Sequence, residues 1–480
     1  MTRALRMTFV TFSVLLAAGE ARARPGGSLP LPDQSESSQP MDLAAIQPFW
    51  RRISDPDLVA LVEEGLAANA DIAQAVARLD GARARSRAAG ARLAPSLGAG
   101  LSSSRSVRIK TIEPASLVPD AAQLNLAYEV DLFGSVRKGR RTARASARAV
   151  AFDVASVRLA VACQILRSHA VIHALDALRR ITAEQIEGTA RTAALIDRRA
   201  AEHEAGPVET ALVAQQLAGL EAYRAQLGAV RAAEVAALAV VLGREPESFV
   251  VPASDEAGDG RNAADRALAS LAPSPVQPLA LLAGRPDVQA AGQALAAARW
   301  NADAVRASRW PNLTLTASGI GGLSGGLPLA FANLGASLGA ALFGGGAIAA
   351  REGLARADTA QTLAFYNRTR LVAAQETIAA LSAMEAATAR VARWDQARAL
   401  VARGVDTAQQ AYLDGDVPIN VLVDTRNDEI ASRRALIEAQ RDLALARIDV
   451  IRATGGTPQW EGSRGEGSRG EAPEIMANAR

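Results

Sequence analysis

The fold of this 480-residue chain is decided by a segment in which apolar and polar residues alternate, QLNLAYEVDLFG at residues 123–134. Leu, Tyr and Val fill the even positions from 124 to 132, whereas Gln, Asn, Ala, Glu and Asp fill the odd positions. Alternation with a period of two places the two sets on opposite faces of a β-strand. The segment is also as long as the ~9–11 residues that a tilted strand needs to cross a membrane.

Three other segments alternate in the same way, at 96–107, 312–318 and 333–342. Their polar positions hold mostly Ser, Thr, Asn and Gly, which suit the water-filled lumen of a membrane barrel. Aromatic residues lie near the segment ends, as in the girdles of membrane barrels; they are Tyr128, Phe133, Trp310, Phe331 and Phe343. The alternative interpretation is a pair of β-hairpins packed on helices in a soluble domain.

Four strands are too few to close a membrane barrel, and an open sheet edge is not tolerated in lipid. Closure needs at least ~8 strands, and a barrel of that size is filled by its own side chains. Three copies of the chain would supply 12 strands and leave room for a lumen. We therefore predict a mainly α-helical protein whose four strands per protomer form part of a 12-stranded trimeric barrel, continued by a helical tunnel.

Landmarks in the first half of the chain recur in the second half. Asp71 and Asp287 open similar helical stretches, and Pro95 and Pro311 end them, both with a numbering offset of 216. Later matches are Leu132-Phe133-Gly134 with Leu342-Phe343-Gly344, offset by 210, and Gly206-x-Val208 with Gly415-x-Val417, offset by 209. The ordered matches indicate a duplication. We predict two repeats, at 24–270 and 271–456.

Each repeat is predicted to contain one helix before its strands (58–93 and 286–309) and a very long helix after them. The long helices would run from Ser135 to Ala205 and from Gly346 to Asp414, and a returning helix would follow each. A continuous 71-residue helix measures roughly 105 Å, which is the length of a coiled-coil-like rod. The chain contains 108 Ala and only 18 aromatic residues, a composition that favours close helix packing.

The two ends of the chain are predicted to lie outside this plan. Arg3 and Arg6 precede the apolar run 7–19, so residues 1–23 are typical of a secretory signal peptide. Glu20 stands where a lipoprotein would have Cys, and this predicts export without lipidation. The tail 457–480 repeats the motif Gly-Ser-Arg-Gly-Glu and is expected to be disordered.

Composition argues against several functional classes. A net charge of +3 gives no strong field for nucleic acid, and a single Cys, Cys163, excludes a disulfide framework. His169 and His173 have a helical spacing that can bind metal, but no third ligand follows a recognisable pattern. We expect no metal, no cofactor and no enzymatic activity.

Several motifs, taken in order along the twofold repeat, resemble the outer-membrane factor family, the TolC-like channels, and within it the NodT-type efflux branch. They are Phe49-Trp50, Asp55-Pro56-Asp57-Leu58, Asn69-Ala70-Asp71-Ile72, the segment 128–134 and Leu342-Phe343-Gly344-Gly345-Gly346. The resemblance implies a homotrimer in the bacterial outer membrane that extends into the periplasm. It also implies two partners, a periplasmic adaptor (membrane fusion) protein and an inner-membrane pump of the RND type.

The resemblance also implies site residues. The adaptor would dock at the far helical turns, formed by Gly206, Pro207 and Val208 and by Gly415, Asp416 and Val417. The periplasmic gate would include Tyr412 and Asp424. Val421 and Val417 occupy positions where family members can have Asp and Arg. The resemblance therefore implies that some of the polar links that hold the gate closed in the family are missing here.

The leading hypothesis is a passive exit duct of a tripartite efflux system for small toxic compounds or drugs. One alternative is a duct for type I protein or polysaccharide secretion. A second alternative, from another class, is a soluble periplasmic coiled-coil scaffold.

Overall fold

The structure, a computed structural model, describes residues 49–102, 121–202, 206–251, 284–324, 327–341, 343–414 and 416–456. All of these residues belong to one compact unit, Leu43–Arg480. The predicted signal peptide, the predicted tail and the predicted repeat boundary near residue 270 lie outside the described residues.

Four strands form one antiparallel sheet in the order β1-β2-β3-β4: β1 (Ser96–Ser102), β2 (Ala121–Val130), β3 (Asn312–Ser324) and β4 (Leu327–Gly339). Their register places the apolar residues opposite one another, because Leu97 pairs with Leu126 and Tyr128 pairs with Leu315. The polar residues share the other face, where Asn125 pairs with Ser318. The predicted alternation is therefore confirmed as two faces of one continuous sheet.

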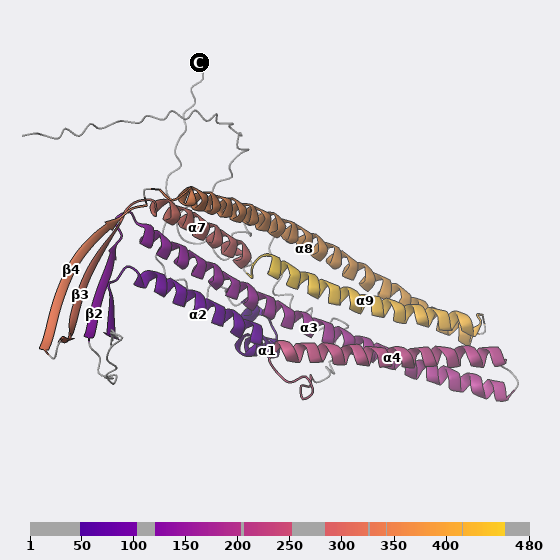
Figure 1. Ribbon diagram of the computed structural model, residues 1–480. Coiled ribbons are helices and arrows are strands. Elements are labelled where there is room, and N and C mark those ends of the chain that lie inside the picture. The colour runs from indigo at the N-terminus through magenta and orange to yellow at the C-terminus, as the bar shows by residue number, and fades with distance from the viewer. Residues whose placement is uncertain are drawn as a thin grey trace, which may run out of the picture. The chain divides into compact units, whose positions relative to one another are not determined.

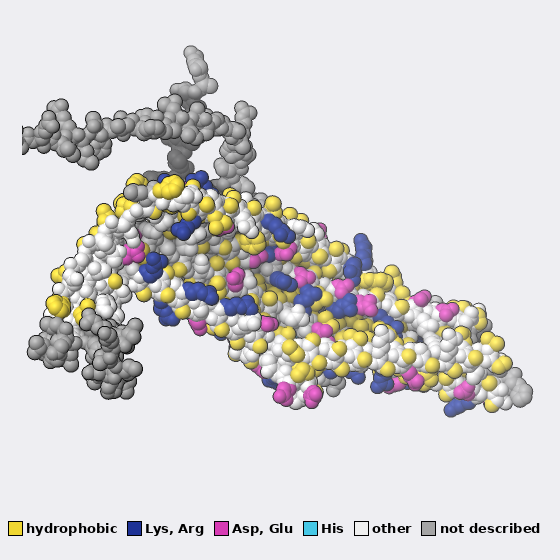
Figure 2. Space-filling view, viewed as in Figure 1, with side chains coloured by type: hydrophobic (Ala, Val, Ile, Leu, Met, Phe, Trp, Pro, Cys, Tyr) yellow, Lys and Arg dark blue, Asp and Glu magenta, His cyan; other side chains and the backbone are white. Residues whose placement is uncertain are grey.

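The apolar face of the sheet is open to solvent in a single protomer. Leu97 is 72% exposed and Leu334 is 87% exposed. Hydrophobic side chains line the outer edge of the sheet (Figure 2). Within the described residues, β1 and β4 each pair on one side only. A sheet of this kind needs an apolar environment for its face and further strands for its edges.

The helices repeat in length as well as in order. The two helices before the strands, α2 (Ala70–Ala91) and α7 (Pro286–Ala307), have 22 residues each. The long helices α3 (Ser135–Ala201) and α8 (Ala347–Leu413) have 67 residues each, and the returning helices α4 (Pro207–Val241) and α9 (Ile419–Ala453) have 35 each. At 1.5 Å per residue, α3 and α8 are about 100 Å long. They run from the sheet to the distant turns (Figure 1).

The numbering offset between the repeats is 216 for α2 and α7, and it is 212 for the two pairs of helices that follow the strands. Gly134 and Gly346, which precede α3 and α8, both have left-handed φ values, of 76° and 86°. They are structural equivalents, so the sequence match of Gly134 with Gly344 is two residues out of register.

The predicted helix 58–93 is wrong in one respect, because Asn69 divides it into α1 (Pro56–Ala68) and α2. Asn69 has an extended backbone, and its Oδ1 accepts hydrogen bonds from the backbone N–H groups of Asp71 and Ile72. Its Nδ2 donates to the carbonyl of Val241, 2.7 Å away at the end of α4. One side chain thus caps α2 and ties it to α4.

The main core lies where α1, α3, α4 and α9 meet. Leu58, Ile165, Leu242 and Ile448 are almost completely buried there, beside Phe49 of the short 3-10 helix η2 (Phe49–Arg52). Cys163 belongs to this core, as predicted, and burial raises the pKa of its thiol to about 12. By length and composition α3 alone, among the described helices, could cross a membrane. Its apolar side chains instead supply this core.

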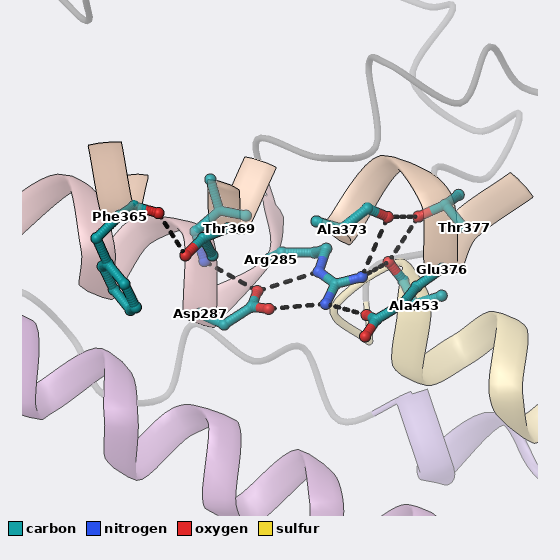
Figure 3. Close-up of polar contacts among 9 residues, drawn as sticks. Arg285, Asp287, Phe365, Thr369, Ala373, Glu376, Thr377 and Ala453 are labelled. Atoms are coloured by element: carbon teal, nitrogen blue, oxygen red, sulfur yellow. Dashed lines mark hydrogen bonds and ion pairs between the residues drawn. The ribbon is translucent and has the colours of Figure 1, made fainter. Parts of the chain in front are cut away.

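Arg285 connects three helices of the second repeat through hydrogen bonds (Figure 3). Its guanidinium group donates to Asp287 Oδ1 and Oδ2 at 3.0 and 2.7 Å and to Glu376 Oε2 at 2.7 Å. It also donates to the carbonyls of Ala373 and Ala453 at 3.4 and 3.2 Å. Burial raises the pKa of Asp287, but the hydrogen bonds and charge of Arg285 outweigh it and lower that pKa overall. Arg285 therefore joins α7, α8 and α9 at one point.

Candidate functional site

The first distant turn connects α3 to α4. Gly206 is the N-cap of α4 with an extended backbone, and Pro207 is the first helical residue, a position that suits its fixed φ and missing N–H. Both are exposed. Val208 is 78% exposed, and Leu212 on the next turn of α4 is exposed as well. The predicted docking residues thus form a small apolar surface at the end of the hairpin.

The second distant turn connects α8 to α9 and is built differently. Asp416 is exposed and donates its N–H to the carbonyl of Ala411 at 2.8 Å, whereas Val417 is half-buried. Gly415 lies outside the described residues. Pro418 is the N-cap of α9, as Gly206 is the N-cap of α4, so the two correspond in the repeat. The sequence match of Gly206 with Gly415 is therefore displaced by three residues in the structure.

The predicted gate residues lie on either side of this second turn. Tyr412 is in the last turn of α8, and its side chain lies outside the described part of the chain. Asp424 is in the second turn of α9 and is exposed. Val421 is also exposed, one helical turn before Asp424. Asp424 and Val421 thus both lie on the surface of the protomer close to the second turn.

A polar seam between the two hairpins was not anticipated from the sequence. Gln216 Nε2 of α4 donates to Asn427 Oδ1 of α9 at 2.8 Å. Further along α9, Arg433 forms an ion pair with Glu184 of α3 at 2.8 Å. These four residues help to line a cavity of about 170 Å³. The partners are 211 and 249 residues apart in the sequence, so no local motif could have predicted these contacts.

A family model described as outer membrane efflux protein matches residues 61–244 and 278–456. The chain belongs to this family. The resemblance stated from the sequence motifs is confirmed, and the two matched segments contain the two sets of equal-length helices.

Two named relatives align with most of this outer membrane efflux protein. The pyoverdine export outer membrane protein OpmQ of Pseudomonas aeruginosa is 27% identical over 446 residues, which cover 88% of this chain and 90% of OpmQ. The toluene efflux pump outer membrane protein TtgC of Pseudomonas putida is 27% identical over 87% of both chains.

Solved structures share the fold of this efflux protein. CusC has a TM-score of 0.75 at 20% identity, covering 85% of this chain and 94% of CusC. The outer membrane protein VceC of Vibrio cholerae has a TM-score of 0.71 at 23% identity, covering 85% and 98%. The mainly helical fold with a short antiparallel sheet is thus confirmed as that of outer-membrane channels.

A pair of histidines lies on α3 of this efflux protein, away from the predicted gate. The ring centroids of His169 and His173 are 4.2 Å apart. Burial, with a smaller contribution from His173, lowers the pKa of His169 to about 3. No cluster of three or more metal-binding side chains occurs in the described part of the chain. His169 is therefore a neutral packing residue at physiological pH.

This burial predicts a loss of stability at mildly acidic pH. The folded state keeps His169 neutral, whereas the unfolded chain protonates it near pH 6.5, so stability falls as pH decreases from 6.5 toward 3. At pH 5 the expected loss is about 2 kcal/mol. Thermal unfolding of the detergent-solubilised protein at pH 7.5 and pH 5 measures it. A His169→Gln variant should lose that part of the pH dependence, and an unchanged dependence in this variant would contradict the assignment.

Proposed function

We propose that this protein is the passive outer-membrane exit duct of a tripartite efflux system and works as a homotrimer. The observation that carries the proposal is the sheet at one end of helices about 100 Å long. Its apolar face is exposed, and within the described residues each of its edge strands pairs on one side only. Three sheets would complete a 12-stranded barrel in lipid, and the helices would enclose a tunnel across the periplasm. An RND-type inner-membrane pump would supply the cargo.

The adaptor would contact the two distant turns. In the first turn Gly206 and Pro207 provide a compact bend, and Val208 offers an exposed apolar contact. In the second turn Asp416 and Val417 lie beside Gly415 in the sequence and supply one charged and one apolar side chain. Exposed apolar side chains at a hairpin end are the kind of surface that a helical partner covers.

Small molecules are the favoured cargo. The relatives are named for pyoverdine export and toluene efflux, and both are transport functions for small compounds. Secretion of protein or polysaccharide is the second candidate, because the same duct could serve it. The chain itself would carry no catalytic activity, since transport through a passive duct requires none.

The proposal is tested by the behaviour of the purified full-length chain. It should require detergent, have the mass of a trimer and give stepwise conductance in planar lipid bilayers. Recovery as a monodisperse protein in detergent-free buffer would contradict it and would favour the soluble coiled-coil scaffold.

The gate is tested through Asp424. Three Asp424 carboxylates near the trimer axis would attract cations, and Tyr412 would narrow the same region. An Asp424→Asn trimer should therefore lose cation selectivity by roughly severalfold. Reversal potentials in a salt gradient measure this ratio. Glu221→Gln, which removes an exposed carboxylate from α4, is the matched control, and equal effects of both substitutions would remove Asp424 from the gate.

A further inference from the structure

Three arginines line a hollow between α2 and α3 at the end next to the sheet. Arg87, Arg140 and Arg144 surround a cavity of about 430 Å³ together with Ser86, Gly90 and Ala91. Gly90 permits the approach of Arg140, since a Cβ atom there would lie 3.3 Å from Arg140 Nε. Among the described residues none of the three guanidinium groups forms an ion pair. The hollow therefore carries three positive charges without an internal counter-charge.

The second repeat shows what an internally balanced version of this site looks like. When α2 is aligned with α7 and α3 with α8, Arg87 corresponds to Asp303 and Arg140 corresponds to Glu352. Asp303 pairs with Arg306 at 3.5 Å, and Glu352 pairs with Arg309 and, at 3.4 Å, with Arg356.

The hydrogen bond from Arg309 and nearby positive charges lower the pKa of Glu352. Acidic residues thus neutralise this position in the second repeat, whereas the first repeat has arginine at both places. All three arginines are exposed, so a negative group from outside the chain can reach them.

Helix geometry turns Arg87, one of the residues that line the hollow, away from the polar face of the sheet. Arg92 contacts Glu129 at 3.7 Å, and Glu129 belongs to the polar face of β2, where it pairs with Thr314. Arg87 precedes Arg92 by five residues, which turns it by about 140° around the helix axis. Arg87 therefore lies on a different side of α2 from Arg92, away from the face that meets the polar side of β2.

The depth of the hollow matches the headgroup layer of a membrane. Phe133 and Trp310 stack with ring centroids 5.5 Å apart and are 44% and 56% exposed, where the sheet meets the helices. Such aromatic pairs mark the membrane–water interface. Arg140 and Arg144 lie six and ten residues beyond Gly134, or about 9 and 15 Å along α3. Arginine side chains at this depth extend back toward the lipid headgroups. Basic side chains are plentiful on the helices beside the sheet (Figure 2).

We propose that Arg87, Arg140 and Arg144 bind the phosphate group of an anionic phospholipid from the periplasmic leaflet of the outer membrane. Guanidinium groups bind phosphate through paired, charge-assisted hydrogen bonds, and three of them can surround one headgroup. The lipid would supply the counter-charge that Asp303 and Glu352 supply in the second repeat. This inference rests on the proposed function insofar as the strands must lie in the membrane.

The experiment uses the full-length protein, purified in detergent and stripped of lipid. Native mass spectrometry follows binding of short-chain phosphatidylglycerol, phosphatidylcholine and inorganic phosphate. The wild type should prefer phosphatidylglycerol to the other two. Each basic group near a membrane surface contributes about a fivefold factor, so changing all three arginines to Gln should weaken this binding by about 100-fold. The Arg140→Gln single variant should show a partial loss.

The matched control changes to Gln three exposed arginines on the parts of α3 and α4 that lie away from the sheet, namely Arg191, Arg198 and Arg224. It should bind phosphatidylglycerol like the wild type. Equal binding by the triple cluster variant, or equal affinity for phosphatidylcholine, would overturn the inference. Binding of inorganic phosphate as tightly as phosphatidylglycerol would also overturn the inference.

A neighbouring subunit could supply the acid instead of a lipid. In that case the wild type would show no preference for phosphatidylglycerol and the cluster variant would dissociate more easily into monomers, which would also overturn the inference. Conductance of the same preparations separates the two proposals. Channels that conduct but bind no anionic lipid contradict only the lipid site, whereas the absence of channels contradicts the proposed function.

Discussion

Replacing Arg285 with Met is expected to destabilise the protein by about 3 kcal/mol, because several hydrogen bonds between helices are lost at once. Arg285 is 7% exposed, and its guanidinium group makes five hydrogen bonds to three helices. Its removal leaves the carboxylate of Asp287 and the carbonyls of Ala373 and Ala453 without this donor. Chemical unfolding of the detergent-solubilised protein, followed by circular dichroism, measures the change.

The first repeat provides a matched comparison for Arg285. Asn69 occupies the corresponding position directly before α2 and donates to Val241, which corresponds to Ala453. Asn69→Ala removes one cap and one tertiary hydrogen bond but leaves no carboxylate without its partner. It should therefore cost only about 1–2 kcal/mol. An equal or larger cost for Asn69→Ala would contradict the central role assigned to Arg285.

The ion pair between Arg285 and Asp287 makes the stability of the protein decrease at acidic pH. The pKa of Asp287 is lowered in the folded state, so this carboxylate stabilises the protein at pH values above its unfolded pKa. The contribution is lost as pH falls below about 4 through the lowered pKa of the folded state. In Arg285→Met the favourable partner is absent, and this part of the acid sensitivity should disappear.

Replacing Gly455 or Gly243 with Ala is the second substitution with a large expected effect, about 3 kcal/mol at either position. Both glycines have left-handed φ values, 74° and 70°. A Cβ atom at Gly455 would lie 2.8 Å from the carbonyl oxygen of Gly284, and one at Gly243 would lie 2.6 Å from that of Ala68. The obstacle is backbone in both cases, so no side chain can move aside.

Gly219 is the control for these glycines. It lies inside α4, is exposed and has nothing within 4 Å of an added Cβ atom. Gly219→Ala should leave stability unchanged or raise it by up to about 1 kcal/mol, because Ala favours the helix. Unfolding midpoints that fall equally for Gly219→Ala and Gly455→Ala would show that close packing at the repeat ends is not the cause.

Much of the fold was predictable because it depends on patterns that are local in the sequence. Alternation at 123–134 predicted β2 and its faces, and Pro207 marked the start of α4. The repeat was detectable, but its register near the second turn was displaced, since Gly206 corresponds to Pro418 and not to Gly415. The two turns differ in sequence while the helices that they join have equal lengths, so a motif match across a turn is a weak guide to register.

The candidate site was predictable only in part. The gate role of Asp424 and the docking role of the two turns come from the resemblance and stay predictions; the structure shows that Asp424 is exposed on α9. The seam formed by Glu184 with Arg433 and by Gln216 with Asn427 was missed, because its partners come from different hairpins. Their side chains carry no signal in the sequence beyond being polar on a helix.

The sequence by itself determined the strand faces, the length of the helical rods and the membership of an outer-membrane efflux family, because periodicity and motif order are properties of the chain. Only the tertiary structure decided where Asn69 divides a helix, that Arg285 joins three helices, and that Arg87 and Arg140 lack the acidic partners found in the second repeat. The contacts of Asn69 and Arg285 that decide this join α2 to α4 and α7 to α8 and α9, helices that are far apart along the chain. Folding alone brings such atoms within hydrogen-bonding distance.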